Sequence, residues 1–241
     1  LLVLDEVADS GPSTCAARVV LGLRRLFSAE TSGIDFVMVT DDDVWLSPPR
    51  LMHDLRELLD IPRHVLYGPL AFAAGWNAAR QSHYGWAPFV DIEQRMPSRA
   101  VFRRGITLAS SRGAIGPFPF LMGYCGVLSG GLAAELAHSA AAASLVKRLL
   151  ATTRTRRPDP GLPRGKCYPG GDVAVGWVLA EMNRRQLLSR PLLLLDITYA
   201  QRVLPYANHY DSAVVRRPQR ACACCRVALS DLCTSSAASS C

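Results

Sequence analysis

The sequence of 241 residues lacks the features that define several common protein classes. No apolar run is long enough to cross a bilayer: the stretch 121–134 is short and rich in glycine, and Glu135 and His138 follow it. No Gly-x-Gly-x-x-Gly or phosphate-loop motif is present, which argues against a dinucleotide-binding domain and against a P-loop NTPase. The sequence also has no internal repeat and no Asn-x-Ser/Thr acceptor for N-glycosylation.

The first residues, Leu1 to Asp5, carry no mark of a targeting signal. They include no initiator methionine, no basic stretch and no long apolar segment. We therefore expect the chain to be an internal part of a longer polypeptide, and a membrane anchor upstream of Leu1 stays an open alternative.

The length and composition predict a globular fold with one sizeable core, or at most two small ones. Hydrophobic residues make up 49% of the chain and charged residues 20%, which excludes a largely disordered protein. The net charge of +7 is concentrated in a Pro/Gly-rich segment, 154–166, and in the tail, 216–226. We favour solvated loops for both, with a patch for an anionic ligand such as a nucleotide diphosphate as the alternative. Nucleic-acid binding is disfavoured because no interleaved aromatics or known module accompany the charge.

The eight cysteines are divided between the body of the chain and its end. Cys15, Cys125 and Cys167 are scattered, whereas five others crowd residues 222–241. That cluster has no second pair at zinc-ribbon spacing and no following histidine, so a zinc site is disfavoured. Disulfides in the tail remain open if the protein is secretory, because their pairing cannot be deduced from sequence.

Strand and helix patterns alternate along most of the chain, which predicts an α/β domain with a mixed, mostly parallel sheet flanked by helices. Expected strands are 1–4, 34–39, 65–66 and 192–197, and expected helices are 14–29, 48–59, 132–150 and 173–184. Residues 68–117 show no clean period. From about residue 212 the periodicity stops, so we expect one domain over 1–211 and a poorly ordered, cysteine-rich tail over 212–241.

The most informative segment is the apolar run 36–39 that ends at the carboxylates Asp41, Asp42 and Asp43. Three adjacent negative charges at a strand end are unfavourable unless a cation neutralises them. Hard cations such as Mn²⁺ or Mg²⁺ prefer carboxylate oxygen, and a metal held in this way commonly holds a phosphate-bearing substrate too. The alternative is a solvated turn or a helix N-cap, which aspartate also favours.

Four tryptophan, tyrosine and phenylalanine residues of the middle segment are candidates for a sugar-binding surface: Trp76, Tyr84, Trp86 and Phe89. Aromatic faces suit the C–H groups of sugars, but such residues are more often part of a core. The glycines within 123–126 predict a close approach of the backbone to a ligand or to another strand.

Several segments, in order, resemble one family, that of the β-1,3-galactosyltransferases and β-1,3-N-acetylglucosaminyltransferases, to which Fringe is related. Residues 35–46 resemble the family's strand that ends in an Asp-Asp-Asp-Val core. Residues 118–129 are similar to its Tyr-Pro-x-Tyr…Gly-x-Gly-Tyr-Val-x-Ser segment, and 168–176 to its Glu-Asp-Val-x-x-Gly block. Residues 9–10 resemble its Asp-Ser-Tyr stretch. The resemblance covers roughly residues 1 to 210.

The resemblance implies a GT-A fold and an inverting, metal-dependent hexosyltransferase that uses a UDP-sugar and acts on a glycan or glycoprotein. Asp43 would bind Mn²⁺ (or Mg²⁺) directly, Asp41 would contact the nucleotide ribose or the metal shell, and Asp42 would support them. Asp172 would be the general base, with an N-cap of the following helix as the alternative. His209 would be a further metal ligand, with a surface or capped histidine as the alternative. The resemblance also implies the lumenal side of the Golgi, as a type II membrane protein anchored outside this chain.

The sequence departs from the family in two places. Gly171 stands where the family has an acidic residue, and the glycine-rich triplet is reduced to Gly-Tyr-Cys-Gly at 123–126. The family's first strand and its nucleotide-contacting residues would lie before Leu1. Two alternatives therefore stay open: a non-catalytic glycan-binding descendant of the fold, and a different metal-dependent enzyme that acts on phosphate esters.

Overall fold

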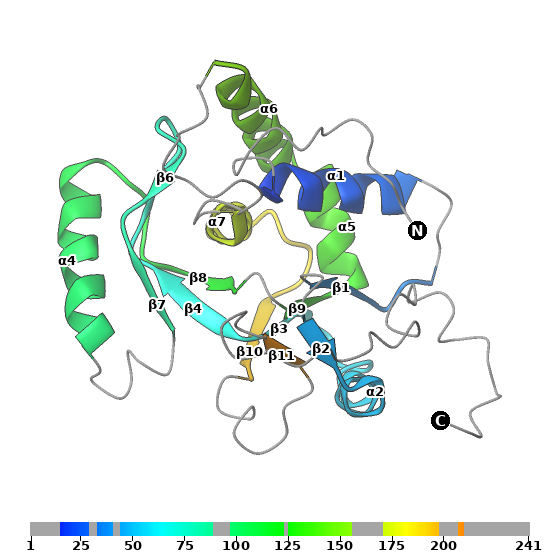
Figure 1. Cartoon of the computed structure of the whole chain (residues 1–241). Coiled ribbons are helices and arrows are strands. Elements are labelled where there is room, and N and C mark those ends of the chain that lie inside the picture. Colours follow the sequence, from blue (N-terminus) through cyan, green and yellow to red (C-terminus); the bar gives the residue numbers. More distant parts are fainter. Residues whose placement is uncertain are drawn as a thin grey trace, which may run out of the picture.

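The chain folds as a mixed α/β protein, as the alternating pattern predicts. A computed structural model describes residues 15–28, 33–40, 44–88, 97–122, 125–155, 171–197 and 207–209. These residues form six helices and eleven strands (Figure 1). None of the described helices combines the length and the apolar character that a bilayer crossing requires. The expected strand 1–4 and the expected tail 212–241 lie outside the described residues.

The main sheet has four strands in the order β1-β9-β3-β10. They are β1 (Phe36–Thr40), β9 (Cys125–Ser129), β3 (His64–Gly68) and β10 (Leu192–Asp196). The β9 strand is antiparallel to both β1 and β3, whereas β3 and β10 are parallel. Three strands thus run in one direction, but only one of the three pairings is parallel. The expectation of a mostly parallel sheet is wrong for this part, because β9 inserts between β1 and β3.

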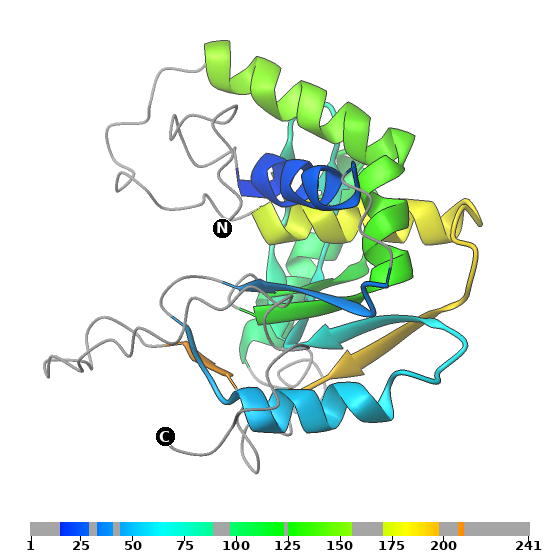
Figure 2. The ribbon, with the colours of Figure 1, turned by 90° about the vertical axis from the view of Figure 1, so that its right-hand side faces the viewer.

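Helices cover both faces of this sheet (Figure 2). On one face lie α1 (Cys15–Ser28), α5 (Gly130–His138), α6 (Ala140–Thr155) and α7 (Gly171–Arg184), and on the other lies α2 (Pro48–Glu57). Successive side chains along a strand therefore face the two helical layers in turn. In β3, Leu66 belongs to the large core under the four helices, whereas Val65 and Tyr67 pack with Leu51 and Leu55 of α2.

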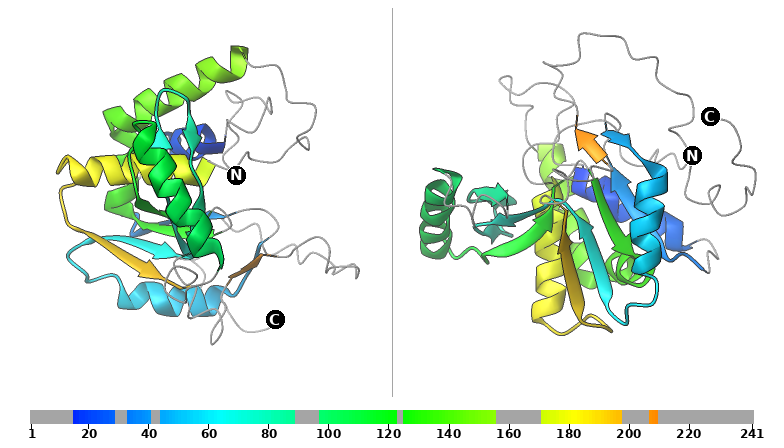
Figure 3. Two further views of the ribbon diagram at one scale, coloured as in Figure 1. Left: turned by 90° about the vertical axis from the view of Figure 1, so that its left-hand side faces the viewer. Right: turned by 90° about the horizontal axis from the view of Figure 1, so that it is seen from below.

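A second sheet, in the order β7-β4-β8, extends the molecule to one side (Figures 1 and 3). It consists of β4 (Leu70–Ala73), β7 (Trp86–Pro88) and β8 (Phe118–Leu121), and α4 (Pro97–Ser111) packs on it. Two short strands, β5 (Trp76–Asn77) and β6 (Ser82–His83), form a hairpin beside it. The sequence did not predict α4, because Val101 and Leu108 are exposed and interrupt its apolar period.

The expected helix 132–150 is in fact two helices, α5 and α6, separated at Ser139. Ser139 has an extended backbone (φ −68°, ψ 141°). Its hydroxyl accepts a hydrogen bond from the Ala142 amide at 3.0 Å and donates one to the Leu136 carbonyl at 3.1 Å. The side chain therefore caps α6 and satisfies the end of α5, which makes the break favourable within an otherwise helix-forming sequence.

The glycine-rich stretch was predicted to let the backbone approach a ligand or another strand closely. Gly126 makes such a close approach. A Cβ atom there would lie 2.5 Å from the side chain of Leu121. Gly126 also pairs with Val39 of β1. The close approach is therefore to another strand, which is one of the two expected outcomes. Cys125, next to it, is buried and is not part of a disulfide, whereas Cys15 forms one.

Candidate functional site

The carboxyl ends of β1, β3 and β10 share one edge of the main sheet, because these three strands run in the same direction. They end at Thr40, Gly68 and Asp196. Residues 41–43, the predicted metal-binding triplet of Asp41, Asp42 and Asp43, follow Thr40 directly and lie outside the described residues. Both residues that flank the triplet, Thr40 and Val44, lie within the described part of the chain. In α/β sheets this edge is where ligands bind.

A two-stranded ribbon joins residues 207–209 to the segment that follows the triplet in sequence. The strands β2 (Val44–Leu46) and β11 (Ala207–His209) pair in an antiparallel manner, with His209 opposite Val44. His209 therefore occupies the register position beside the residue that follows Asp43. The structure thus pairs the backbone of His209 with that of Val44, although the two residues are more than 160 positions apart in sequence.

The N-terminus of α7, which carries Asp172, lies on the same side of the molecule. In Figure 2, α1 and α7 both begin on the side where β1 ends and where β2 and β11 lie. Close packing joins the two helix starts: a Cβ atom at Gly171 would lie 3.0 Å from the Cβ of Cys15. An acidic side chain in place of Gly171, as the family has, would thus need space that α1 occupies.

Asp172 itself is the second residue of α7 and is half-buried. Its Oδ1 accepts a hydrogen bond from the Val173 amide at 2.8 Å. A carboxylate in the first turn is favourable because it meets free amides and the positive end of the helix dipole. This hydrogen bond supports the alternative, a structural role of Asp172 at the helix start. The role of Asp172 as a general base stays a prediction.

The donors at this edge fit a hard divalent cation by their chemistry. Carboxylate oxygens and one imidazole are suitable ligands for Mn²⁺. The described residues, which do not include the triplet, contain no group of three or more side chains that could hold a metal ion.

Sequence reasoning missed Asp196, which ends β10 at the same edge. Its Oδ1 accepts a hydrogen bond from the Leu70 amide at 2.9 Å and so positions the chain between β3 and β4. The signal was present: four leucines run into this aspartate, the same pattern of an apolar strand ending in a carboxylate that singled out the triplet.

The aromatic candidates for sugar binding separate into two kinds. Trp76 is only 3% exposed and stacks on Trp177 with ring centroids 6.3 Å apart, so it belongs to the core. Trp86 is 42% exposed and meets Phe120 edge-on. Tyr84 is half-buried, and Phe89 lies outside the described residues. Of the three described candidates, Trp86 is the most exposed.

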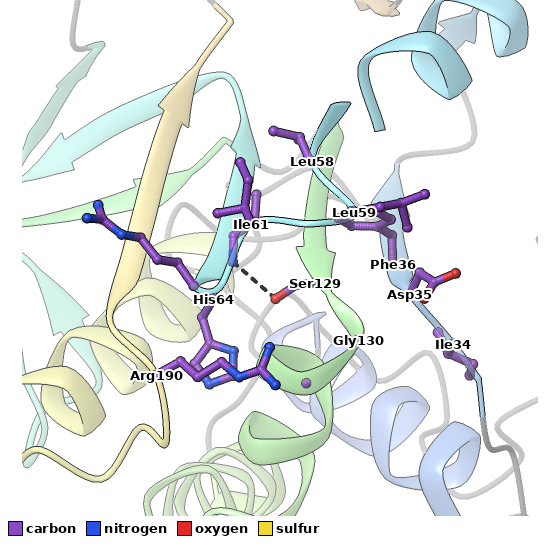
Figure 4. Close-up of a pocket in the computed structure, with 13 residues that line it drawn as sticks. Ile34, Asp35, Phe36, Leu58, Leu59, Ile61, His64, Ser129, Gly130 and Arg190 are labelled. Atoms are coloured by element: carbon purple, nitrogen blue, oxygen red, sulfur yellow. Dashed lines mark hydrogen bonds between the residues drawn. The ribbon is translucent and has the colours of Figure 1, made fainter. Parts of the chain in front are cut away.

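A pocket lies at the opposite edge of the main sheet from the triplet (Figure 4). It is lined by the start of β1, the start of β3 and the turn from β9 into α5. Its most buried polar residue is His64, which is 3% exposed. The His64 Nε2 lies 3.0 Å from Glu135 Oε1 and 3.3 Å from Ser189 Oγ. Ser189 also donates hydrogen bonds to Glu135 through its hydroxyl and its amide.

These contacts lower the pKa of Glu135 from its ordinary value of 4.5. Partial burial opposes the shift, but the hydrogen bonds from Ser189 and the nearby His64 outweigh it. A serine, a histidine and a carboxylate suggest a nucleophilic triad, but this arrangement does not form one. Both Ser189 and Glu135 face the same nitrogen, Nε2, whereas a triad needs the carboxylate on the nitrogen opposite to the serine.

No protein-family model matches the chain, and no curated protein is significantly similar to it.

Proposed function

We propose that the chain is the catalytic domain of an inverting, metal-dependent glycosyltransferase of the GT-A type. It would move a hexose or an N-acetylhexosamine from a UDP-sugar to a hydroxyl of a glycan or glycoprotein, with a β-1,3 linkage by family resemblance. The observation that carries the proposal is the pairing of β11 with β2, because it sets His209 beside Val44, the residue that follows Asp43. By the same resemblance, the proposed location is the Golgi lumen, through an anchor outside this chain.

The metal site would be formed by Asp43, Asp41 and His209. A bound Mn²⁺ or Mg²⁺ supplies a Lewis acid that stabilises the negative charge of the departing UDP. Asp42 supports the two ligating aspartates, and Asp41 also meets the nucleotide.

The acceptor hydroxyl must lose its proton as its oxygen attacks the anomeric carbon of the sugar. Asp172 is the proposed base that accepts this proton at a carboxylate oxygen. Its Oδ1 accepts a hydrogen bond from the Val173 amide, which holds the carboxylate at the start of α7. A single displacement on the face opposite to UDP inverts the anomeric configuration.

UDP binding measured by calorimetry, with and without Mn²⁺, tests the proposal. The full-length protein should bind UDP in a Mn²⁺-dependent manner, and Asp43→Ala should lose that binding. Asp60→Ala is the matched control, because it removes an exposed aspartate after α2. Binding by Asp43→Ala equal to that of the control would overturn the assignment of the metal site.

One contact favours the non-catalytic alternative, a glycan-binding descendant of the fold: the Asp172 carboxylate is engaged by its own helix. That alternative predicts glycan binding without UDP binding or turnover. Hydrolysis of a simple phosphate ester, without sugar transfer, would instead indicate a different metal-dependent enzyme that acts on phosphate esters.

A further inference from the structure

The lobe formed by the second sheet and α4 carries positive charge that no carboxylate of the lobe balances. In Figures 1 and 3, α4 lies at the outer rim of this lobe, on the side away from the main sheet. The described residues of the lobe, 70–88 and 97–121, include no aspartate and no glutamate. They do include five arginines: Arg80, Arg99, Arg103, Arg104 and Arg112. Within the described part of the chain, none of these five forms an ion pair.

Apolar side chains are exposed on the same helix as three of these arginines. Val101 is 60% exposed and Leu108 is 47% exposed. Their separation of seven residues places them on one face of α4, and Arg104, which is also exposed, lies between them on that face. Phe102 and Ala109, one residue further along the chain in each case, are buried. The orientation of α4 about its axis is therefore fixed, with Val101 and Leu108 turned to solvent.

The hairpin of β5 and β6 adds a second group of the same kind at the end of α4. Arg112 directly follows the helix, and its carbonyl accepts a hydrogen bond from Asn77 Nδ2 at 3.2 Å. The Oδ1 of the same side chain accepts a hydrogen bond from the Arg80 amide at 2.9 Å. Asn77 thus holds two exposed arginines close together. Ile115, which is 42% exposed, pairs with Trp76, the neighbour of Asn77.

From these observations we propose that this surface docks the protein on a bilayer that contains anionic phospholipids. The surface, called the α4 surface below, consists of Arg80, Val101, Arg104, Leu108, Arg112 and Ile115. The guanidinium groups donate hydrogen bonds to lipid phosphates, and the aliphatic side chains enter the boundary between headgroups and acyl chains. The axis of α4 then lies in the plane of the membrane surface.

The arrangement of the α4 surface favours a bilayer over a protein partner. Val101 and Leu108 are two helical turns apart, with Arg104 between them. The binding energy of a protein partner is concentrated in a compact cluster of aromatic and arginine anchors, and the α4 surface contains no aromatic residue. A bilayer surface offers phosphates and acyl chains across its whole area, so it satisfies arginines and aliphatic side chains that alternate along a helix. The lack of carboxylates in the described lobe fits an anionic surface, which would repel them.

Flotation of the full-length protein with lipid vesicles tests the proposal. Vesicles of phosphatidylcholine mixed with phosphatidylserine should capture the protein, and vesicles of phosphatidylcholine alone should capture much less. Arg104→Gln combined with Arg112→Gln should lower the partition coefficient about 25-fold, which is about fivefold for each basic residue near an anionic bilayer. The matched control, Arg56→Gln combined with Arg63→Gln, removes two exposed arginines outside the lobe. It should bind nearly as the wild type does, because charges away from the membrane are screened.

A second variant separates insertion into the bilayer from attraction by charge. Val101→Ser combined with Leu108→Ser keeps every arginine and should lower the partition coefficient about tenfold, because less apolar area enters the membrane. Both positions are exposed, so the melting temperature should stay close to that of the wild type. Mn²⁺-dependent UDP binding should be unchanged in the arginine and serine variants, which keeps this test separate from that of the proposed function.

Two sets of results would overturn the proposal. The first is failure of the wild type to float with the anionic vesicles, or equal capture of the arginine variant and its control. The second is a loss of capture in the arginine variant while the serine variant floats as the wild type does. Charge alone would then account for binding, and a soluble acidic partner would replace the bilayer.

Discussion

His209 lies opposite Val44 in the antiparallel ribbon of β11 and β2, one position from the aspartate triplet. Directly opposed residues of an antiparallel pair have side chains within reach of each other's neighbours. Two segments from different ends of the chain thus meet where the predicted metal site begins.

Replacement of His209 by alanine should raise the dissociation constant for Mn²⁺ by at least about tenfold, the scale expected when a metal site loses one supporting group. The measurement is Mn²⁺ binding followed by calorimetry or by electron paramagnetic resonance. His138→Ala removes an exposed histidine at the end of α5 and should leave the affinity unchanged. Equal Mn²⁺ affinity in the two variants would remove His209 from the ligand set.

Asp172→Asn should lower turnover about 10²- to 10⁴-fold while UDP binding changes little, because asparagine accepts a hydrogen bond but cannot take up the proton. Steady-state kinetics and calorimetry of UDP binding measure the two effects separately. Asparagine also keeps the contact to the Val173 amide, so the melting temperature should stay close to that of the wild type. If UDP binding and turnover fall together, Asp172 is structural.

Gly176→Ala should destabilise the fold by about 1–3 kcal/mol, the usual cost of an added methyl group in a filled interior. A Cβ at Gly176 would lie 2.3 Å from the Cβ of Phe120, which is 1% exposed and cannot move away. Urea denaturation followed by circular dichroism gives the free energy of unfolding. Asn183→Ala, at an exposed position of the same helix, should change it by less than about 0.5 kcal/mol. Similar values for the two variants would mean that α7 and β8 are not packed as described.

The carboxylate of Glu135 should contribute stability that disappears in acid. Because its pKa is lower in the folded state than its ordinary value of 4.5, the folded protein binds fewer protons near that pH than the unfolded chain does. The contribution is complete above the ordinary pKa and is lost as the pH falls through the folded pKa. Glu135→Gln should therefore be less stable than the wild type near neutral pH, and this difference should shrink in acid.

Urea denaturation of both proteins across this pH range measures the difference. The control is Glu57→Gln, which changes an exposed glutamate at the end of α2. Its free energy of unfolding should not differ from that of the wild type in a pH-dependent way. If the free energies of unfolding of Glu135→Gln and the wild type differ by the same amount at all pH values, the charge of the carboxylate does not contribute to stability.

The sequence predicted the elements whose apolar residues follow a regular period. The expected helices 14–29 and 173–184 are confirmed as α1 and α7, and the expected strand 192–197 as β10, within two residues at each end. The helix α4 was not predicted because Val101 and Leu108 are apolar but exposed. The apolar residues of this segment therefore do not follow the period of a single buried helix face. The break at Ser139 depends on a hydroxyl that serves two helix ends, and a helical pattern does not reveal it.

The strand pairing and the pocket required the three-dimensional structure. Adjacent strands in the sheet come from distant segments, so no local pattern indicates that β9 separates β1 from β3. The triplet was evident because its charges are consecutive. In contrast, His64, Glu135 and Ser189 are each unremarkable in sequence, and only the fold brings their polar atoms together.

The central position of β9 has a consequence for how the chain folds during synthesis. Both neighbours of this strand, β1 and β3, are made before residue 69, but the strand that joins them ends at Ser129. Until then, each of them presents unpaired backbone groups to other chains, which is the situation that promotes aggregation. A ribosome-bound chain that stops before residue 125 should remain without a main sheet, and chaperone binding should be strongest over that interval.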